Sequence, residues 1–140
     1  MKTHVIVQAR VGSTRLPGKI FEEILAKPML SHVLDRLRFA KKLDGVMLAI
    51  PDTAENNALE EFCQQEGVPC YRGPEDDVLA RYYGAAKAFG TDTVVRITSD
   101  CPCIDPALVD MLVGRYYDLK ADYIELDVER NFPRGVDAEV

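Results

Sequence analysis

The sequence predicts an α/β domain in which a mainly parallel sheet is sandwiched between helices. Two observations carry this prediction: short apolar, β-branched runs recur along the chain, and amphipathic segments of helical length separate them. Strands that alternate with such helices form right-handed βαβ crossovers, whose strands are parallel. No internal repeat, low-complexity tract or polar linker interrupts the alternation, so we expect a single domain over residues 1–140.

Five runs are candidate strands. Each is rich in Val, Ile, Leu, Tyr or Thr, the residues that fit a pleated and partly buried surface. The five runs are Thr3–Gln8, Val46–Ile50, Val68–Tyr71, Thr93–Thr98 and Ala121–Leu126.

Four segments have the apolar spacing of amphipathic helices. The first follows Pro28, because proline suits the first helical turn. The second is expected to begin with a capping-box-like pair, Asp52 and Glu55, and to end at a glycine. The third is expected over residues 75–89, and the fourth begins at Asp105. The apolar positions that carry the first, second and fourth helices are Leu30, Val33, Leu34 and Leu37; Leu59, Phe62 and Cys63; and Leu108, Val109, Leu112, Val113, Tyr116 and Tyr117.

Composition narrows the class of protein. Hydrophobic residues make up 47% and charged residues 29% of the chain, which is typical of a globular domain. A net charge of -6 disfavours nonspecific binding to nucleic acid or to an anionic membrane. No apolar run has the length of a signal or membrane segment, so we expect a cytoplasmic protein with free cysteines. Cys101 and Cys103 lack the second close Cys or His pair that a zinc site requires.

The loop after the first candidate strand has the composition of a phosphate site. Residues 8–19 hold three cations, two hydroxyls and two glycines, whose backbone N–H groups can approach an anion closely. The Walker A pattern does not fit, because five residues separate Gly12 from Gly18 and Lys19 precedes Ile20. The dinucleotide fingerprint is also absent. A solvated basic turn is the alternative interpretation.

Two acidic residues follow candidate strands. Asp100 comes after the fourth, and ligands of open α/β sheets bind beyond the carboxyl ends of strands where the strand order reverses. If the first and fourth strands are neighbours, Asp100 meets the basic loop, where a carboxylate and phosphate oxygens would suit Mg²⁺. The alternative is that Asp100 caps a turn. Asp52 follows the second strand and either lines the same cleft or caps a helix.

Residues 71–83 combine a turn, an acidic helix start and an aromatic and basic face. The acids at 75–77 are explained as complements of a helix dipole. Arg72 and Arg81 are better ligand candidates, because nothing local explains them. Tyr82 and Tyr83 are expected in the core.

Taken together, these segments resemble the cytidylyltransferase family. The branch that they resemble is the spore coat polysaccharide biosynthesis protein F-like group, related to the acylneuraminate and 3-deoxy-manno-octulosonate cytidylyltransferases. The resemblance covers nearly the whole chain from Val5 and includes several motifs in the same order. These motifs are residues 8–10 with 17–19, 71–73 with 75–82, 96–98 with 100–102, and 132–137.

The resemblance implies a three-layer, Rossmann-like nucleotide-diphospho-sugar transferase fold. The implied activity is transfer of CMP from CTP to a sugar hydroxyl, which gives a CMP-sugar and pyrophosphate for cell-surface polysaccharide biosynthesis. Arg10, Ser13, Arg15 and Lys19 would grip the phosphates and Asp100 would ligate Mg²⁺. On this interpretation Arg15, Lys19 and Asp100 are the catalytic residues, and the partners are CTP, an acidic sugar and, in a homodimer, a second copy.

The remaining candidate residues are assigned on the same basis. The nucleotide-binding set is Gln8, Ala9, Arg10, Gly12, Ser13, Arg15, Lys19, Asp52, Arg72 and Arg96, and the substrate-binding set is Asp77, Arg81, Arg134 and Asp137. The chain departs from the family at Ser99, where glycine is usual, and at Cys103, where an aliphatic residue is common.

Two other functions stay open. One is a catalytically silent nucleotide-binding or interaction domain. The other is a glycosyltransferase of the same fold, which would need an Asp-x-Asp pair that the sequence lacks. Residues 130–140 begin what looks like a further strand and then stop, so we expect a chain truncated at its C-terminus, without the second acidic metal ligand of the family.

Overall fold

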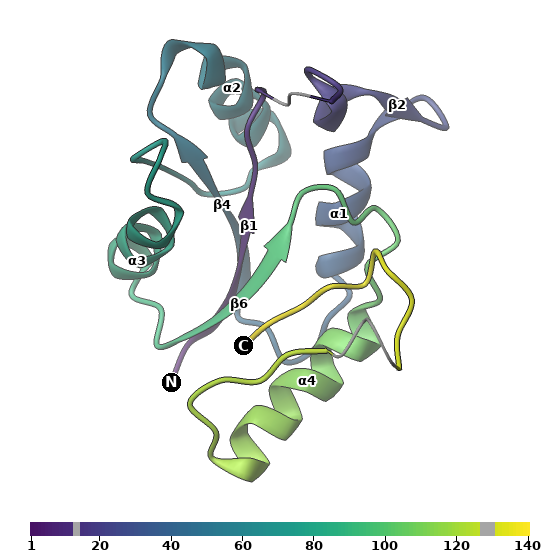
Figure 1. Cartoon of the computed structure of the whole chain (residues 1–140), viewed down its shortest axis with the longest axis vertical. Coiled ribbons are helices and arrows are strands. Elements are labelled where there is room, and N and C mark those ends of the chain that lie inside the picture. Colours follow the sequence, from purple (N-terminus) through teal and green to yellow (C-terminus); the bar gives the residue numbers. More distant parts are fainter. Residues whose placement is uncertain (13–14, 127–130) are drawn as a thin grey trace.

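The computed structural model describes residues 1–12, 15–126 and 131–140. A parallel sheet lies between two layers of helices (Figure 1), which confirms the predicted α/β class. Within the described ranges, no helix is both long and apolar enough to cross a membrane.

The central sheet has four strands in the order β5-β4-β1-β6, and all neighbours are parallel. Strand β1 therefore pairs on both sides, with Gln8 opposite Ala49 of β4 and Thr98 of β6. The first and fourth candidate strands are therefore neighbours, which is the condition under which Asp100 is expected to meet the basic loop. The strands of this sheet are β1 (Thr3–Gln8), β4 (Gly45–Pro51), β5 (Cys70–Gly73) and β6 (Thr93–Thr98).

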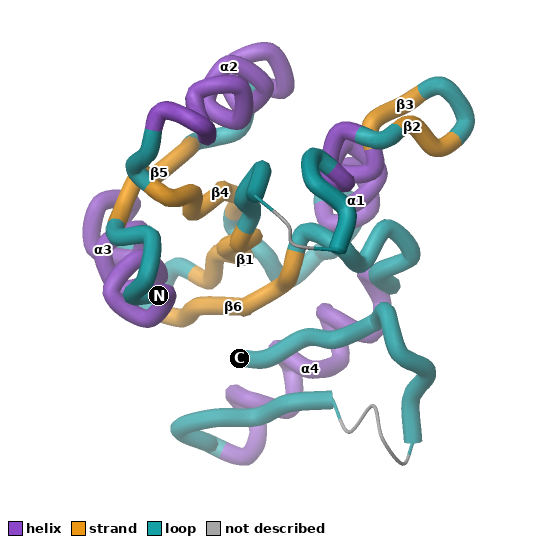
Figure 2. The backbone as a smooth tube through the Cα atoms, turned by 45° about the horizontal axis from the view of Figure 1, so that its top comes forward, coloured by secondary structure: helices purple, strands orange, loops and turns teal. Residues whose placement is uncertain are grey.

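Helices cover both faces of the sheet (Figure 2). Side chains alternate across a strand, so Val5 and Val7 of β1 enter the larger core cluster and Ile6 enters the smaller one. The larger cluster packs α1 (Met29–Leu37), α2 (Asn57–Glu66) and α4 (Pro106–Leu119) on one face. The smaller cluster packs α3 (Val78–Phe89) on the other. Two short 3-10 helices, η1 (Lys19–Phe21) and η2 (Ala54–Asn56), precede α1 and α2.

The predicted strand at residues 121–126 is wrong. Its residues form only an isolated antiparallel bridge, from Glu125 to Glu139. Glu139 also bridges Arg96 of β6, so residues 138–140 lie between this segment and the sheet. Backbone groups of Ile124 and Leu126 therefore form their hydrogen bonds with residues 138–140 rather than with a strand of the parallel sheet.

The predicted starts of two helices are also corrected. Helix α2 begins at Asn57, after η2, and no side chain caps its N-terminus. Asp52 contacts a β5 arginine instead of starting the helix. Helix α3 begins at Val78, three residues later than predicted, because Asp77 caps it by accepting a hydrogen bond from the backbone N–H of Ala80 at 2.8 Å.

Of the two neighbouring tyrosines on α3, only one lies in the core. Tyr82 is buried, whereas Tyr83 is 64% exposed, so the prediction that both are core residues is wrong for Tyr83. Adjacent positions on a helix point in different directions, and only one of them faces the sheet.

A hairpin that the sequence analysis missed follows η1. Strands β2 (Glu23–Ile24) and β3 (Lys27–Pro28) pair antiparallel around a two-residue turn, Leu25–Ala26. Both turn residues have positive φ, 53° and 59°. Such turns favour Asn-Gly, because a Cβ atom crowds the backbone in the left-handed region. The turn is therefore strained by its own side chains.

Replacing Leu25 with Asn and Ala26 with Gly should stabilise the protein by about 1 kcal/mol, because both new residues tolerate positive φ. Urea unfolding followed by circular dichroism measures this change. The matched control is Ala88→Gly on the exposed face of α3, which should instead cost about 1 kcal/mol. A hairpin variant no more stable than the parent would contradict the assignment of strain to this turn.

Candidate functional site

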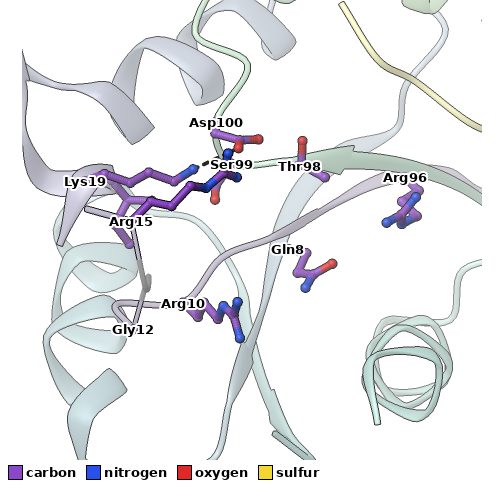
Figure 3. Close-up of a pocket in the computed structure, with 10 residues that line it drawn as sticks. Gln8, Arg10, Gly12, Arg15, Lys19, Arg96, Thr98, Ser99 and Asp100 are labelled. Carbon is purple, nitrogen blue, oxygen red and sulfur yellow. Dashed lines mark hydrogen bonds and ion pairs between the residues drawn. The ribbon is translucent and has the colours of Figure 1, made fainter. Parts of the chain in front are cut away.

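A pocket of about 320 Å³ opens at the carboxyl ends of β1 and β6 (Figure 3). Strands β4 and β6 lie on opposite sides of β1, so this is the point at which the strand order reverses. The described residues that line the pocket are Gln8, Arg10, Gly12, Arg15, Lys19, Ile20, Arg96, Thr98, Ser99 and Asp100.

The loop after β1 is held by hydrogen bonds of the backbone groups of Val11 and Gly18. The N–H of Gly18 donates to the carbonyl of Val11 at 3.0 Å, and the N–H of Val11 donates to the side-chain oxygen of Asn56 at 2.9 Å. Gly18 has a φ of 69°, which glycine adopts without a steric penalty, and it starts η1. These contacts direct Lys19 into the pocket.

Asn56 positions this loop and was missed by the sequence analysis. Its side chain is 1% exposed, and its amide also donates to the hydroxyl of Thr53 at 2.8 Å. No sequence signal separates such an asparagine from one that caps a helix, because its partner Val11 is distant in the chain.

Lys19 and Asp100 meet across the pocket, as the sequence analysis predicted for the basic loop and this acid. The ammonium nitrogen of Lys19 lies 2.8 Å from Oδ2 of Asp100. This hydrogen bond lowers the pKa of Asp100 below its ordinary value, although burial acts in the opposite direction. A lowered pKa in the folded state stabilises the protein above the unfolded-state pKa, and that contribution disappears as the pH falls through the folded-state pKa.

Two other cations of the pocket have no acidic partner among the residues that the structure describes. Arg10 and Arg15 are exposed, and neither forms an ion pair with a residue in the described ranges. Arg96 is bound by Glu139 and lies 5.8 Å from the ring of Tyr82. Among the described lining residues, Lys19 and Arg96 thus have acidic partners, and the charges of Arg10 and Arg15 remain to attract an anion.

Asp52 and Arg72 do not line this pocket. Arg72 donates to Asp52 at 2.9 Å, to Glu60 at 2.7 Å and to the carbonyl of Thr53 at 2.9 Å. Hydrogen bonds to Glu60 and then to Asp52 raise the pKa of Arg72. The three side chains link β5 to α2 and to the segment after β4.

Arg81 and Asp77 also lie outside the lining of the pocket. Arg81 is 1% exposed and donates to the carbonyls of Pro74 at 2.7 Å and Glu75 at 3.2 Å. Burial lowers the pKa of Arg81, and repulsion from Arg10 acts in the same direction. The buried guanidinium therefore holds the turn that precedes α3, and Asp77 caps the N-terminus of this helix.

The remaining predicted residues are placed as follows. Ala9 is buried at the start of the basic loop, and its N–H donates to the carbonyl of Ala49 at 3.3 Å. Asp137 accepts from the N–H of Gly135 at 3.0 Å and lies 3.9 Å from the thiol of Cys101. Arg134 is exposed. Ser13 lies outside the described residues.

The donors in the pocket fit a magnesium ion only in part. Asp100 supplies one carboxylate, with Thr98 and Ser99 beside it. In the described part of the chain, no three His, Cys, Asp or Glu side chains gather into a group that could hold a metal. Mg²⁺ is commonly bound through one or two carboxylates together with substrate phosphates, so Asp100 fits a metal that arrives with a phosphorylated ligand.

Comparison with known proteins places this geometry in a family. A sequence profile described as cytidylyltransferase matches residues 4–132. The spore coat polysaccharide biosynthesis protein SpsF of Bacillus subtilis is 33% identical and aligns over 96% of this chain. A cytidylyltransferase from Leptospira borgpetersenii superposes with a TM-score of 0.91 at 36% identity over 99% of this chain. A CMP:2-keto-3-deoxy-manno-octonic acid synthetase complexed with CTP superposes with a TM-score of 0.77 at 25% identity over 92% of this chain.

These relatives are longer than the chain. It spans 57% of the Bacillus subtilis protein, 59% of the Leptospira borgpetersenii chain and 55% of the synthetase chain.

Replacing Lys19 with Gln should raise the pKa of Asp100, because the charged hydrogen bond that lowers it is lost. Lys19→Arg keeps a cation that can reach the carboxylate and should leave this pKa low. Carboxyl carbon NMR during a pH titration measures the shift for Asp100. If the Gln variant titrates like the parent, the ion pair does not form in solution.

Proposed function

The chain belongs to the cytidylyltransferase family, and from this premise we propose that it binds CTP and transfers CMP to the hydroxyl of a sugar. The observation that carries the proposal is the position of Arg10 and Arg15, which form no ion pair with the described residues, beside Lys19 at the carboxyl end of β1. A triphosphate supplies the negative charge that these cations lack. A solved relative whose name states a complex with CTP has the same fold, which supports the choice of nucleotide.

In the proposed reaction the sugar hydroxyl attacks the α-phosphorus in line, and pyrophosphate leaves. Arg10, Arg15 and Lys19 bind the phosphates and stabilise the charge that grows on the transferred and leaving oxygens. Holding both reactants in one pocket also removes much of the entropic cost of their encounter. No covalent enzyme intermediate is required.

Asp100 is the proposed ligand of a divalent cation, which we take to be Mg²⁺. When bound, the ion would neutralise phosphate charge and polarise the reacting phosphoryl group. Thr98 and Ser99 flank the carboxylate and would orient it or bound water.

The proposed acceptor is an acidic sugar destined for cell-surface polysaccharide. Relatives named 3-deoxy-manno-octulosonate cytidylyltransferases, including one from Nitratidesulfovibrio vulgaris, support this class of acceptor. Arg134 and Asp137 stay predicted acceptor ligands. A cytoplasmic location, a homodimer and the absence of nucleic-acid or membrane partners also stay predictions.

Titration calorimetry with CTP, UTP, ATP and GTP, each with and without Mg²⁺, tests the proposed nucleotide. CTP should bind selectively, and Lys19→Ala or Arg15→Ala should weaken its binding by about 1.5–3 kcal/mol through loss of a charge-assisted phosphate contact. Arg72→Ala is the matched control, because Arg72 is an arginine outside the pocket and should leave CTP affinity unchanged. Unchanged CTP affinity in the Lys19 and Arg15 variants would exclude the loop as the phosphate site.

Asp100→Asn should spare much of the CTP binding and abolish pyrophosphate release, because the lost charge matters most in the transition state. The assay measures pyrophosphate release from CTP and Mg²⁺ in the presence of a panel of sugar acids. A variant as active as the parent would reject Asp100. CTP binding by the parent without any turnover would favour a nucleotide-binding domain without catalysis.

A further inference from the structure

In the pocket, the side chains of Lys19 and Asp100 form an ion pair with each other. The two side chains come from η1 and from the segment after β6, and they meet with Nζ and Oδ2 2.8 Å apart (Figure 3). They are 30% and 44% exposed, so either can leave the pair without disturbing the core. An ammonium group therefore binds a carboxylate oxygen that a divalent cation would need.

The described residues around Asp100 offer few further ligands to a metal ion that would displace the ammonium group of Lys19. Asp100 is the sole acidic side chain among the described residues that line the pocket, and Thr98 and Ser99 offer neutral oxygens. Arg10 and Arg15 add positive charge that repels a metal ion, whereas the charge of Arg96 is balanced by Glu139. A metal ion that enters alone would have to separate the pair and leave Lys19 without an anion.

A bound triphosphate removes both obstacles to metal binding, namely the loss of an anionic partner by Lys19 and the lack of further metal ligands beside Asp100. Its oxygens offer Lys19 a new anionic partner, and they offer a metal ion further ligands beside Asp100. The exchange moves no proton and breaks no covalent bond, since an ammonium passes from a carboxylate to a phosphate.

We propose that, when no nucleotide is bound, the ammonium group of Lys19 occupies the position of the divalent cation at Asp100, so that metal and nucleotide bind together and the metal does not bind first. The inference rests on the proposed function, because it takes Asp100 as the metal ligand and phosphates as the partner of Lys19. Linkage then requires that the metal strengthen nucleotide binding by the same factor by which the nucleotide strengthens metal binding.

Titration of Mn²⁺ into the nucleotide-free protein, with free Mn²⁺ followed by electron paramagnetic resonance, tests the pair directly. The parent protein should bind Mn²⁺ weakly. Lys19→Gln should bind it about tenfold more tightly, because the competing ammonium is gone. Lys19→Arg keeps a competing cation and should bind as weakly as the parent.

Arg10→Gln is the matched control for charge. It removes the same positive charge from the pocket, but Figure 3 shows Arg10 on the far side from Asp100. Its Mn²⁺ affinity should rise by about twofold or less, since only the diffuse repulsion is relieved. An equal rise in the Arg10 and Lys19 variants would show a general field effect and overturn the proposal. Unchanged Mn²⁺ affinity in Lys19→Gln would also overturn it.

The double variant Lys19→Gln with Asp100→Asn locates the metal. The affinity gained in Lys19→Gln should disappear, whereas its retention would place Mn²⁺ elsewhere and reject the proposal. Circular dichroism checks that each variant is folded. Failure of the proposed function has a different signature, namely no CTP binding by the parent, and leaves the nucleotide-free Mn²⁺ comparison interpretable.

Discussion

The site depends on the parallel pairing of β6 with β1. This pairing sets Thr98 opposite Gln8, so the segments that follow the two strands leave the sheet at the same level and on the same edge. Lys19 and Asp100 are 81 residues apart in the sequence, and this register brings them into contact. The strand order also reverses beside β1, and ligands of open α/β sheets bind in the crevice at such a point.

Charge distinguishes this edge from the rest of the surface. The chain carries a net charge of -6, and two arginines outside the pocket each form ion pairs with two acidic side chains. Arg72 is held by two carboxylates, and Arg38 contacts Asp35 and Glu66. Arg10 and Arg15 make no such pair within the described residues, although acidic side chains are abundant. Arg115 and Arg134 also lack an ion pair among the described residues, so what distinguishes Arg10 and Arg15 is that both line one pocket with Lys19, where an anionic ligand would meet all three.

The fold and the centre of the site could be predicted because both follow from local patterns. Short apolar, β-branched runs located β1 and β6, and the rule for open sheets then brought Asp100 to the basic loop on the condition that the two strands are neighbours. Other features depend on contacts that no local pattern encodes. Arg72 is an example, because its partners Asp52 and Glu60 are 20 and 12 residues away in sequence. The strands of the Leu25–Ala26 hairpin have two residues each, too few for a periodic signal. The run at 121–126 has strand-like composition, but its pairing partner is the end of the chain.

The pocket combines a fixed frame with one exchangeable contact. Arg81 belongs to the frame, because its buried guanidinium donates to the backbone carbonyls of Pro74 and Glu75 and so fixes the turn before α3. A buried cation is expensive to move, since any new position would leave it or the carbonyls without a partner. Lys19 and Asp100 are partly exposed, and an exposed ion pair is worth little in water. Ligand entry can therefore rearrange this pair at small cost while the buried contacts keep the remaining groups in position.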